Sequence, residues 1–179
     1  MTTRHRTRAA AIIRPFGFED MSWAEVLIGG EMSGRHQARR GELIDVLALA
    51  GLVAEVDGRP VGLLTHDVVG RDCEIAYIEV EGDRRRLGVG TALLDALSDR
   101  VSSGSIGADR VWLVTTNDNV DALRFYQRRG FVLKVLRPGA VTEARRHLKA
   151  QIPKVGSYGI ELRDELELER VFTHTASTL

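Results

Sequence analysis

The chain has 179 residues, of which 44% are hydrophobic and 28% are charged, as expected for one globular domain of ordinary size. Its formal net charge is zero, which argues against a general affinity for nucleic acid. The single cysteine, Cys73, excludes an intrachain disulfide and suits a reducing cytoplasm, and no apolar run approaches the ~20 residues of a membrane span. We therefore expect a cytoplasmic domain over residues 1–179, with loose tails at 1–8 and 173–179 and no membrane or nucleic-acid partner.

The first half of the chain predicts one strand, one helix and then an antiparallel meander. Apolar residues have helical spacing around 23–27, and the polar stretch 33–40 is compatible with a second helix or a mobile loop. Turn signals at 57–58 and 70–72 separate the later apolar runs, and such short turns imply antiparallel pairing. We expect strands over 10–14, 51–56, 61–69 and 74–80.

The second half alternates between helical and strand patterns. A 3.6-residue apolar period predicts the first helix, and Asn119 supplies an N-cap for the second, which ends at Gly130. We expect a helix over 88–100, a strand over 110–116, a helix over 119–129, a strand over 131–136, a helical piece over 142–150 and a strand over 161–171. The order predicts an α/β (α+β) domain with a mixed sheet and helices on both faces.

A glycine turn, Arg85-Arg86-Leu87-Gly88-Val89-Gly90-Thr91, joins a predicted strand to an amphipathic helix. A helix N-terminus presents free N–H groups and partial positive charge, and glycines let a phosphate approach the backbone, so the turn suits a pyrophosphate. A Walker loop would need Gly-Lys-Ser/Thr, which is absent, and a dinucleotide-binding fold would need a third glycine where Leu93 stands. The remaining pattern is the R-x-x-G-x-G/A of CoA-binding acetyltransferases.

A second block follows, Asn119-x-x-Ala122-x-x-Phe125-Tyr126 and then Gly130-Phe131. With the glycine turn, it makes the chain resemble the GNAT superfamily of N-acetyltransferases over roughly residues 10–136. The resemblance implies a mostly antiparallel central sheet of about seven strands and acetyl-CoA as cosubstrate. One departure is visible, because many members carry a proline soon after the strand, where this chain has Val80-Glu81-Gly82-Asp83. Gly82 can serve that turn.

The resemblance also implies roles for individual residues. The strand before the turn splays from its neighbour and bonds the pantetheine arm through its backbone, and Tyr126 lies beside the CoA sulfur. A tyrosine, whose ordinary pKa is near 10, is protonated at neutral pH and can donate to the leaving thiolate. The residues expected to bind the cofactor are Ile78, Val80, Arg85, Arg86, Leu87, Gly88, Val89, Gly90, Thr91, Asn119, Ala122 and Tyr126.

Two carboxylates are candidates for the base that takes a proton from the acceptor ammonium. Glu74 and Glu79 lie five residues apart on the predicted strand, which predicts that they face opposite sides of the sheet. Glu74 lies fourteen residues before Gly88, the spacing of the general base in histone-type members of the superfamily, and Glu79 lies closer to the cofactor. A base acting through a water chain is a third hypothesis, and either carboxylate could instead be a solvated strand residue.

Alternation in the last strand puts Glu165, Glu167 and Glu169 on one face and the leucines between them on the other. In the GNAT topology this strand inserts between two others near the splay, so an acidic stripe there would attract a small cationic acceptor. The alternative is a solvent-facing strand edge. The segment 39–45, with Arg40 and Asp45, corresponds to a region that usually forms one wall of the acceptor site.

The main hypothesis is therefore an acetyl-CoA-dependent N-acetyltransferase acting on a small-molecule amine. The alternative is a CoA-binding regulatory module without catalysis. The histidines show no metal-ligand spacing, so no metal is expected. Homodimers are common in the family, and the sequence leaves the oligomeric state open.

Overall fold

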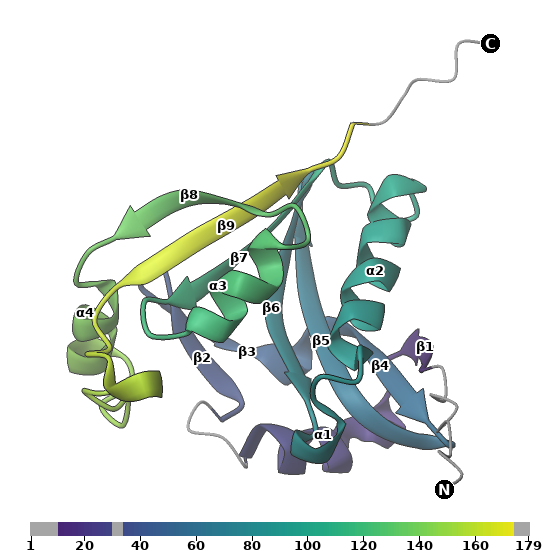
Figure 1. Cartoon of the computed structure of the whole chain (residues 1–179), viewed down its shortest axis with the longest axis horizontal. Coiled ribbons are helices and arrows are strands. Elements are labelled where there is room, and N and C mark those ends of the chain that lie inside the picture. Colours follow the sequence, from purple (N-terminus) through teal and green to yellow (C-terminus); the bar gives the residue numbers. More distant parts are fainter. Residues whose placement is uncertain (1–10, 30–33, 174–179) are drawn as a thin grey trace, which may run out of the picture.

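A computed structural model describes residues 11–29 and 34–173 of the chain. Its main feature is a seven-stranded sheet (Figure 1). In spatial order, the strands are β1 (Ile12–Pro15), β4 (Ala50–Val56), β5 (Arg59–Val69), β6 (Asp72–Val80), β7 (Arg110–Thr116), β9 (Glu165–Val171) and β8 (Val132–Arg137). The predicted tails lie outside the described residues, apart from Thr173.

The pairing of the strands confirms the predicted mixed, mostly antiparallel sheet. Every neighbouring pair is antiparallel except β6 and β7, which run parallel. The last strand in sequence, β9, lies between β7 and β8, as the GNAT topology implies. Residues 110–116 form β7 with the predicted bounds, whereas β9 begins at Glu165, four residues later than expected.

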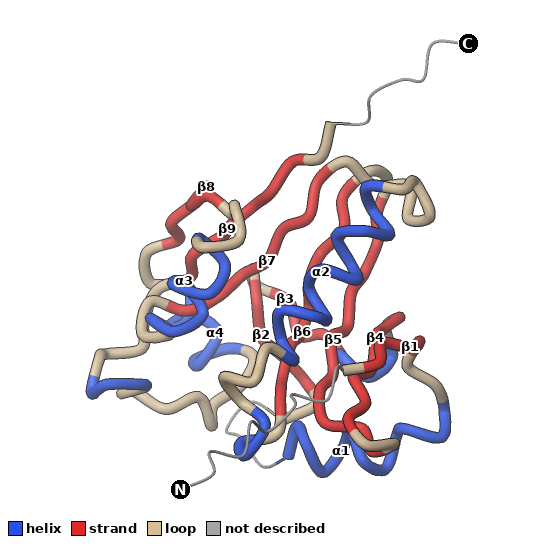
Figure 2. Tube along the Cα trace, turned by 45° about the vertical axis from the view of Figure 1, so that its right-hand side comes forward, coloured by secondary structure: helices blue, strands red, loops and turns tan. Residues whose placement is uncertain are grey.

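Helices cover both faces of the sheet, as predicted. They are α1 (Met21–Gly29), α2 (Val89–Ser102), α3 (Val120–Gln127) and α4 (Ala140–His147). In Figure 1, α2 and α3 lie in front of the sheet, and Figure 2 shows α2 running across its strands. None of the helices in the described residues is long and apolar enough to span a membrane.

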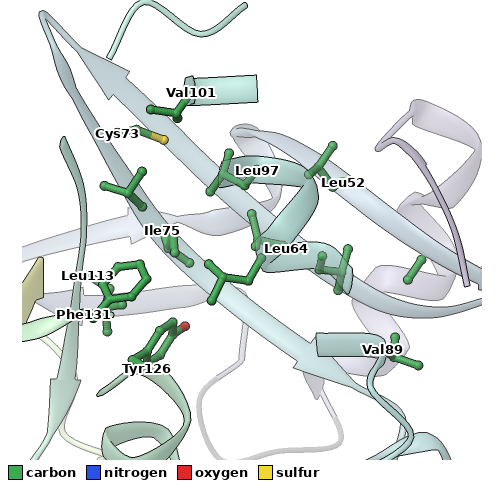
Figure 3. Packing of buried hydrophobic residues seen from close by; sticks show 14 of the residues in the cluster. Leu52, Leu64, Cys73, Ile75, Val89, Leu97, Val101, Leu113, Tyr126 and Phe131 are labelled. Atoms are coloured by element: carbon green, nitrogen blue, oxygen red, sulfur yellow. The ribbon is translucent and has the colours of Figure 1, made fainter. Parts of the chain in front are cut away.

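Alternation along β4 and β5 produces two separate hydrophobic cores. Leu52 and Leu64 face α2 and pack with Leu93 in the larger core (Figure 3). Their strand neighbours face the opposite side and pack against α1 in the smaller core, which comprises Ala24, Ile28, Val46, Leu47, Val53 and Leu63. Cys73 is fully buried in the larger core.

The polar stretch predicted as a helix or a mobile loop is instead half of a β-hairpin. Strands β2 (His36–Arg39) and β3 (Glu42–Asp45) pair with each other and lie behind the main sheet in Figure 1. Arg40 (φ 51°) and Gly41 (φ 78°) form the two-residue turn between them, both in the left-handed region that a type I′ turn requires. Because the hairpin is mostly polar, hydrophobic periodicity gave no signal for it.

Candidate functional site

The site begins where two strands separate. β6 pairs with β7 only through Asp72, Cys73 and Glu74, and the two strands then diverge (Figure 1). From residue 75 onward β6 pairs with β5 alone among the described strands, so its other edge offers backbone N–H and C=O groups to a ligand. The splay implied by the family resemblance is therefore present in this fold.

The glycine turn lies at the N-terminus of α2, which follows β6 in the chain. Gly88 is the N-cap residue and has φ 88°, a left-handed conformation that favours glycine. The first intrahelical bond runs from the Ala92 N–H to the Gly88 carbonyl over 2.9 Å, so the N–H groups of Val89, Gly90 and Thr91 have no partner within the helix. Backbone N–H groups in this position suit an anion.

Two residues of the turn have positions that bear on its predicted role. A Cβ added at Gly90 would lie 3.7 Å from Phe125 and Val80, an ordinary contact, so protein packing alone does not require glycine there. The Arg85 side chain folds back, because its Nε donates to the Val80 carbonyl over 3.1 Å and its guanidinium pairs with Glu79. Arg85 thus braces the turn against the end of β6.

Helix α3 is connected to the same turn. Asn119 is its N-cap and accepts a hydrogen bond from the Ala122 N–H over 3.1 Å. At the other end of α3, Arg129 bonds the Thr91 hydroxyl and stacks its guanidinium 3.8 Å from the centre of the Phe125 ring. The first turn of α2 and the end of α3 are therefore held as one unit through Arg129, which belongs to neither of the motifs recognised in the sequence.

Tyr126 lies inside this unit with only 4% of its surface exposed. Its ring packs edge-to-face against Phe125 and Phe131, at centroid distances of 5.1 and 5.3 Å. Figure 3 shows the Tyr126 hydroxyl on the side of the ring away from Phe131. Burial raises the pKa of Tyr126 well above its ordinary value, so the phenol keeps its proton at neutral pH.

A β-bulge in β6 corrects the prediction that Glu74 and Glu79 face opposite sides. Thr65 pairs with Tyr77 and the next residue of β5 pairs with Ile75, which leaves Ala76 as an extra residue. Side chains along β5 alternate regularly, so residues 63 and 67 face the same side of the sheet. Their partners on β6 are Glu79 and Glu74, which therefore also share a face, and that face is directed away from α2.

Glu74 is 6% exposed and has an arginine beside it. Arg39 of the hairpin donates from Nη2 to Glu74 Oε2 over 2.8 Å, and its Nε lies 2.5 Å from Oε1. That Nε is not aligned for a hydrogen bond and has no other hydrogen-bond partner in the described part of the chain. Burial raises the pKa of Glu74 and Arg39 opposes the shift, with burial the larger effect.

Glu79 is engaged differently. Its carboxylate accepts a hydrogen bond from the Tyr77 hydroxyl over 3.1 Å and pairs with Arg85 of the glycine turn. It therefore links the outer half of β6 to the turn. Trp23 of α1 packs against the smaller core and donates from Nε1 to Glu81 over 3.0 Å.

A cavity of about 500 Å³ lies over the paired half of β6 and β7, under the tip of the hairpin. Its lining is almost entirely charged: Arg39, Arg40, Glu42, Asp67, Val69, Asp72, Glu74, Arg110, Trp112, Arg137 and Glu167. Glu74 borders it, so the candidate base faces this space. We refer to it as the acceptor pocket. Of the four predicted acceptor-site residues, Arg40 and Glu167 line it, whereas Glu165 lines a neighbouring cavity of about 550 Å³.

The acidic stripe of β9 is not available to a cationic ligand in the way that we expected. All three glutamates are buried, so the alternative of a solvent-facing edge is also wrong. Glu167 lies 2.5 Å from both Arg110 and Arg137, and Glu169 lies 2.6 Å from Arg110 and 2.7 Å from Lys134. These cations come from the two neighbouring strands and already balance both carboxylates.

The other two predicted acceptor residues have structural partners. Glu165 accepts hydrogen bonds from the Arg40 N–H over 3.1 Å, and burial raises its pKa. Asp45 forms a two-pronged ion pair with Arg35, at 2.6 and 2.7 Å, and caps the turn that follows by accepting from the Leu47 N–H. Asp45 therefore stabilises the end of the hairpin and does not line either cavity.

Outside the segment 39–45, sequence reasoning missed most of the pocket lining, including Asp67, Arg110 and Trp112. Each of these lies on a strand that the sequence predicted, and none belongs to a recognisable motif. One signal was present for the hairpin, because Arg40-Gly41 is a two-residue turn between short polar segments.

Comparisons with known proteins agree with this architecture. A model of the acetyltransferase (GNAT) family matches residues 21–131. The uncharacterized Bacillus subtilis protein YdhI is 40% identical over 114 residues, which cover 64% of this chain and 68% of YdhI.

Two solved structures share the fold. Ard1 from Thermoplasma volcanium superposes with a TM-score of 0.69 at 22% identity, covering 92% of this chain and 99% of Ard1. A Bacillus subtilis acetyltransferase in complex with CoA gives a TM-score of 0.66 at 20% identity, covering 92% of this chain and all of that one.

Proposed function

Because the chain belongs to the GNAT family of acetyltransferases, we propose that it transfers the acetyl group of acetyl-CoA to a primary amine by direct attack. The observation that carries this proposal is one assembly of three features. They are the edge of β6 that pairs with no described strand beyond Glu74, the N–H groups at the start of α2 that have no partner within the helix, and the buried, protonated Tyr126. Together they provide a ligand edge, an anion site and an acid.

The cofactor would be held mainly by backbone groups. The N–H groups from Leu87 to Thr91 suit the pyrophosphate, with Arg86 beside them, and the edge of Ile78 and Val80 suits the amide groups of the pantetheine arm. The absence of a packing reason for glycine at Gly90 supports the idea that a ligand needs the space. Bound acetyl-CoA would supply the thioester carbonyl that the amine attacks.

The chain's residues supply the proton transfers. The acceptor enters as an ammonium and must lose a proton, which we assign to the Glu74 carboxylate, directly or through a water. The amine nitrogen then bonds to the thioester carbon, the carbon–sulfur bond breaks, and the thiolate takes the Tyr126 proton. Amide formation releases a second proton from the nitrogen, which returns through solvent to the Tyr126 phenolate and restores its hydroxyl. The products are an N-acetylated amine and CoA with a free thiol.

For the acceptor, we propose a small-molecule amine that enters the acceptor pocket. Its ammonium would lie near Glu74 and Asp67, which face each other across β6 and β5. A cationic acceptor was expected from the glutamates of β9. Glu167 and Glu169 are already paired with basic side chains, and Glu165 bonds a backbone N–H, so they do not support a polycationic molecule. The carboxylates at the head of the pocket support a single ammonium.

Amine-dependent release of the CoA thiol, measured over a panel of primary amines, tests this function. We expect release with at least one amine, and we expect Tyr126→Phe to lower kcat by about 10²-fold or more, since general acid catalysis typically contributes that much. Binding of acetyl-CoA, followed by the shift in Tm, should persist in the variant because the phenol ring remains. Tight CoA binding without amine-dependent release would instead support the regulatory module.

A further inference from the structure

The arginines of the acceptor pocket differ in their partners. Three of the four have carboxylates within ion-pair distance: Arg39 pairs with Glu74 and Glu42, Arg110 with Glu167 and Glu169, and Arg137 with Glu167. Arg40 has no carboxylate ion pair anywhere in residues 11–29 and 34–173. Its guanidinium lies over the ring of Trp112, with Cζ 4.9 Å from the ring centroid.

The fold holds Arg40 in an unfavourable backbone conformation. Its φ of 51° costs a residue with a Cβ about 1–2 kcal/mol, and glycine, asparagine or aspartate would fit this turn better. The Arg40 N–H donates to both carboxylate oxygens of Glu165, which is 2% exposed, so a buried group fixes this backbone. A strained arginine with a locked backbone and a stacked side chain suggests a functional reason for the guanidinium.

A carboxylate without a cation lies on the other side of Glu74. Asp67 is half-buried, and its Oδ1 accepts a hydrogen bond from the Val68 N–H. It forms no ion pair within the described part of the chain. Asp67 is opposite Glu74 on β5, and Trp112 is opposite Glu74 on β7. Asp67 and Trp112 are therefore two strand spacings apart, about 10 Å. The Asp67 carboxylate and the Arg40 guanidinium stacked on Trp112 face one pocket from either side of the candidate base.

We propose that the acceptor is a small amine that also carries an oxyanion, which binds the Arg40 guanidinium stacked on Trp112. The inference rests on the proposed function and names its substrate class. A guanidinium presents a planar fork of N–H donors that matches a carboxylate or a phosphate. An amino acid and an aminoalkyl phosphate share this chemistry, with the ammonium directed to Asp67 and Glu74 and the oxyanion to Arg40.

Matched pairs of acceptors that differ in one charge test the proposal. Amino acids are compared with their α-amides, and aminoethyl phosphate with aminoethanol, by kcat/KM for thiol release and by calorimetric Kd on the CoA-saturated protein. We expect the anionic member of one pair to be favoured by about 10- to 100-fold, mainly in KM, as for a hydrogen-bonded ion pair. The pair that shows the preference identifies the oxyanion as carboxylate or phosphate.

Variants of Arg40 connect that preference to the residue. Arg40→Asn removes the guanidinium but suits the left-handed turn, so it should reduce the preference to within about twofold while the protein stays folded by Tm. Arg40→Lys should retain part of the preference, because lysine keeps the positive charge but lacks the planar fork of N–H donors. Arg59→Gln is the control, because it removes an exposed arginine at the opposite end of β5 from the pocket and should leave the preference unchanged.

The outcomes separate the two proposals. Acetylation of both members at equal rates would overturn the oxyanion site and leave the acetyltransferase function standing. In a second outcome, the protein binds the anionic member selectively, Arg40→Asn abolishes that selectivity, and no thiol is released. This outcome would overturn the acetyltransferase function and support the oxyanion site. No binding preference in any pair would overturn the site.

Discussion

The surroundings of Glu74 shift its pKa in opposite directions. Burial favours its neutral form, whereas Arg39 favours the carboxylate, and the nearby Asp67 adds to the effect of burial. Only Oε2 accepts an aligned hydrogen bond from Arg39, so Oε1 retains lone pairs that could take a proton. A carboxylate with a raised pKa is also a better base than an ordinary one. Both properties favour Glu74 over Glu79 as the group that deprotonates the acceptor.

The pH dependence of Glu74→Gln tests that assignment. The base acts when ionised, so activity should fall as the pH drops through the pKa of Glu74, which burial raises above the ordinary glutamate value of about 4.3. We expect the substitution to lower kcat/KM by about 10²-fold or more and to remove this acid limb of the profile. The measurement is kcat/KM for thiol release between about pH 4 and pH 9.

Glu79→Gln is the matched comparison on the same strand. It should keep the acid limb, and its main effect should be on the KM for acetyl-CoA, because Glu79 pairs with Arg85 of the glycine turn. Loss of the acid limb in Glu79→Gln and its retention in Glu74→Gln would reverse the assignment.

At the scale of elements, one inserted residue decides which side chains meet. Without the extra Ala76, alternation would turn Glu79 to the face that α2 covers. The bulge instead brings Glu74 and Glu79 to one face and coincides with the point where β6 leaves β7. Sequence alternation alone predicted opposite faces, because a bulge depends on how the neighbouring strand pairs and leaves no local mark.

Close packing of α2 on β5 gives a second test of how elements position the site. A Cβ at Gly62 would lie 2.9 Å from Val89 Cγ1, and Val89 is the first residue of α2. Gly62→Ala should therefore push the start of α2 away from the sheet and raise the Kd of CoA several-fold, with a loss of roughly 1–3 kcal/mol in the free energy of unfolding.

The control for that experiment is Gly107→Ala, in the loop before β7. An added Cβ there meets no atom within 4 Å, so stability and CoA affinity should both stay close to those of the parent protein. CoA affinity that is equal in Gly62→Ala and Gly107→Ala would mean that the start of α2 does not set the cofactor site. CoA affinity is measured by calorimetric titration and stability by urea unfolding.

How much of this fold and site the sequence could predict depends on whether each feature has a signal in the local sequence. Apolar periodicity located α2 and the four strands that the first half contributes to the main sheet, and the motifs around Gly88 and Asn119 indicated the end of the fold that we propose for the cofactor. The acceptor end could not be found in this way. Its polar hairpin lacks periodicity, and its charges are matched across strands that are distant in sequence, as Arg39 and Glu74 are.

Over the whole molecule, the zero net charge conceals a network of opposite charges built around two buried glutamates. Three neighbouring strands, β7, β9 and β8, contribute Arg110, the two glutamates at 167 and 169, and the basic residues Lys134 and Arg137. The network forms one wall of the acceptor pocket and fixes the sheet beyond the splay. An acidic stripe that looked like a substrate attractor in the sequence thus serves to join strands.

Arg110→Gln tests how strongly this network holds the sheet. Each glutamate keeps one other cation, so we expect a loss of about 2 kcal/mol in the free energy of unfolding at pH 7, less than for a buried carboxylate left without any partner. Glu169→Gln should also destabilise the protein. The double variant should lose about 1 kcal/mol less than the sum of the two, because the residues act on each other.

The pH dependence of Arg110→Gln follows from the same contacts. Burial acts to raise the pKa of Glu167, but Arg137 and Arg110 together outweigh it, and Lys134 with Arg110 lowers the pKa of Glu169. The stabilisation is therefore present above the unfolded-state value of about 4.3 and is lost as the pH falls through the folded-state values. The difference in unfolding free energy between the parent protein and Arg110→Gln should therefore be constant from pH 8 to about pH 5 and shrink below about pH 4. Urea unfolding across this range measures it. A difference that stayed constant down to pH 3 would mean that Arg110 stabilises the sheet through its packing on Trp112, over whose ring its Cζ lies at 5.4 Å, and not through the glutamates.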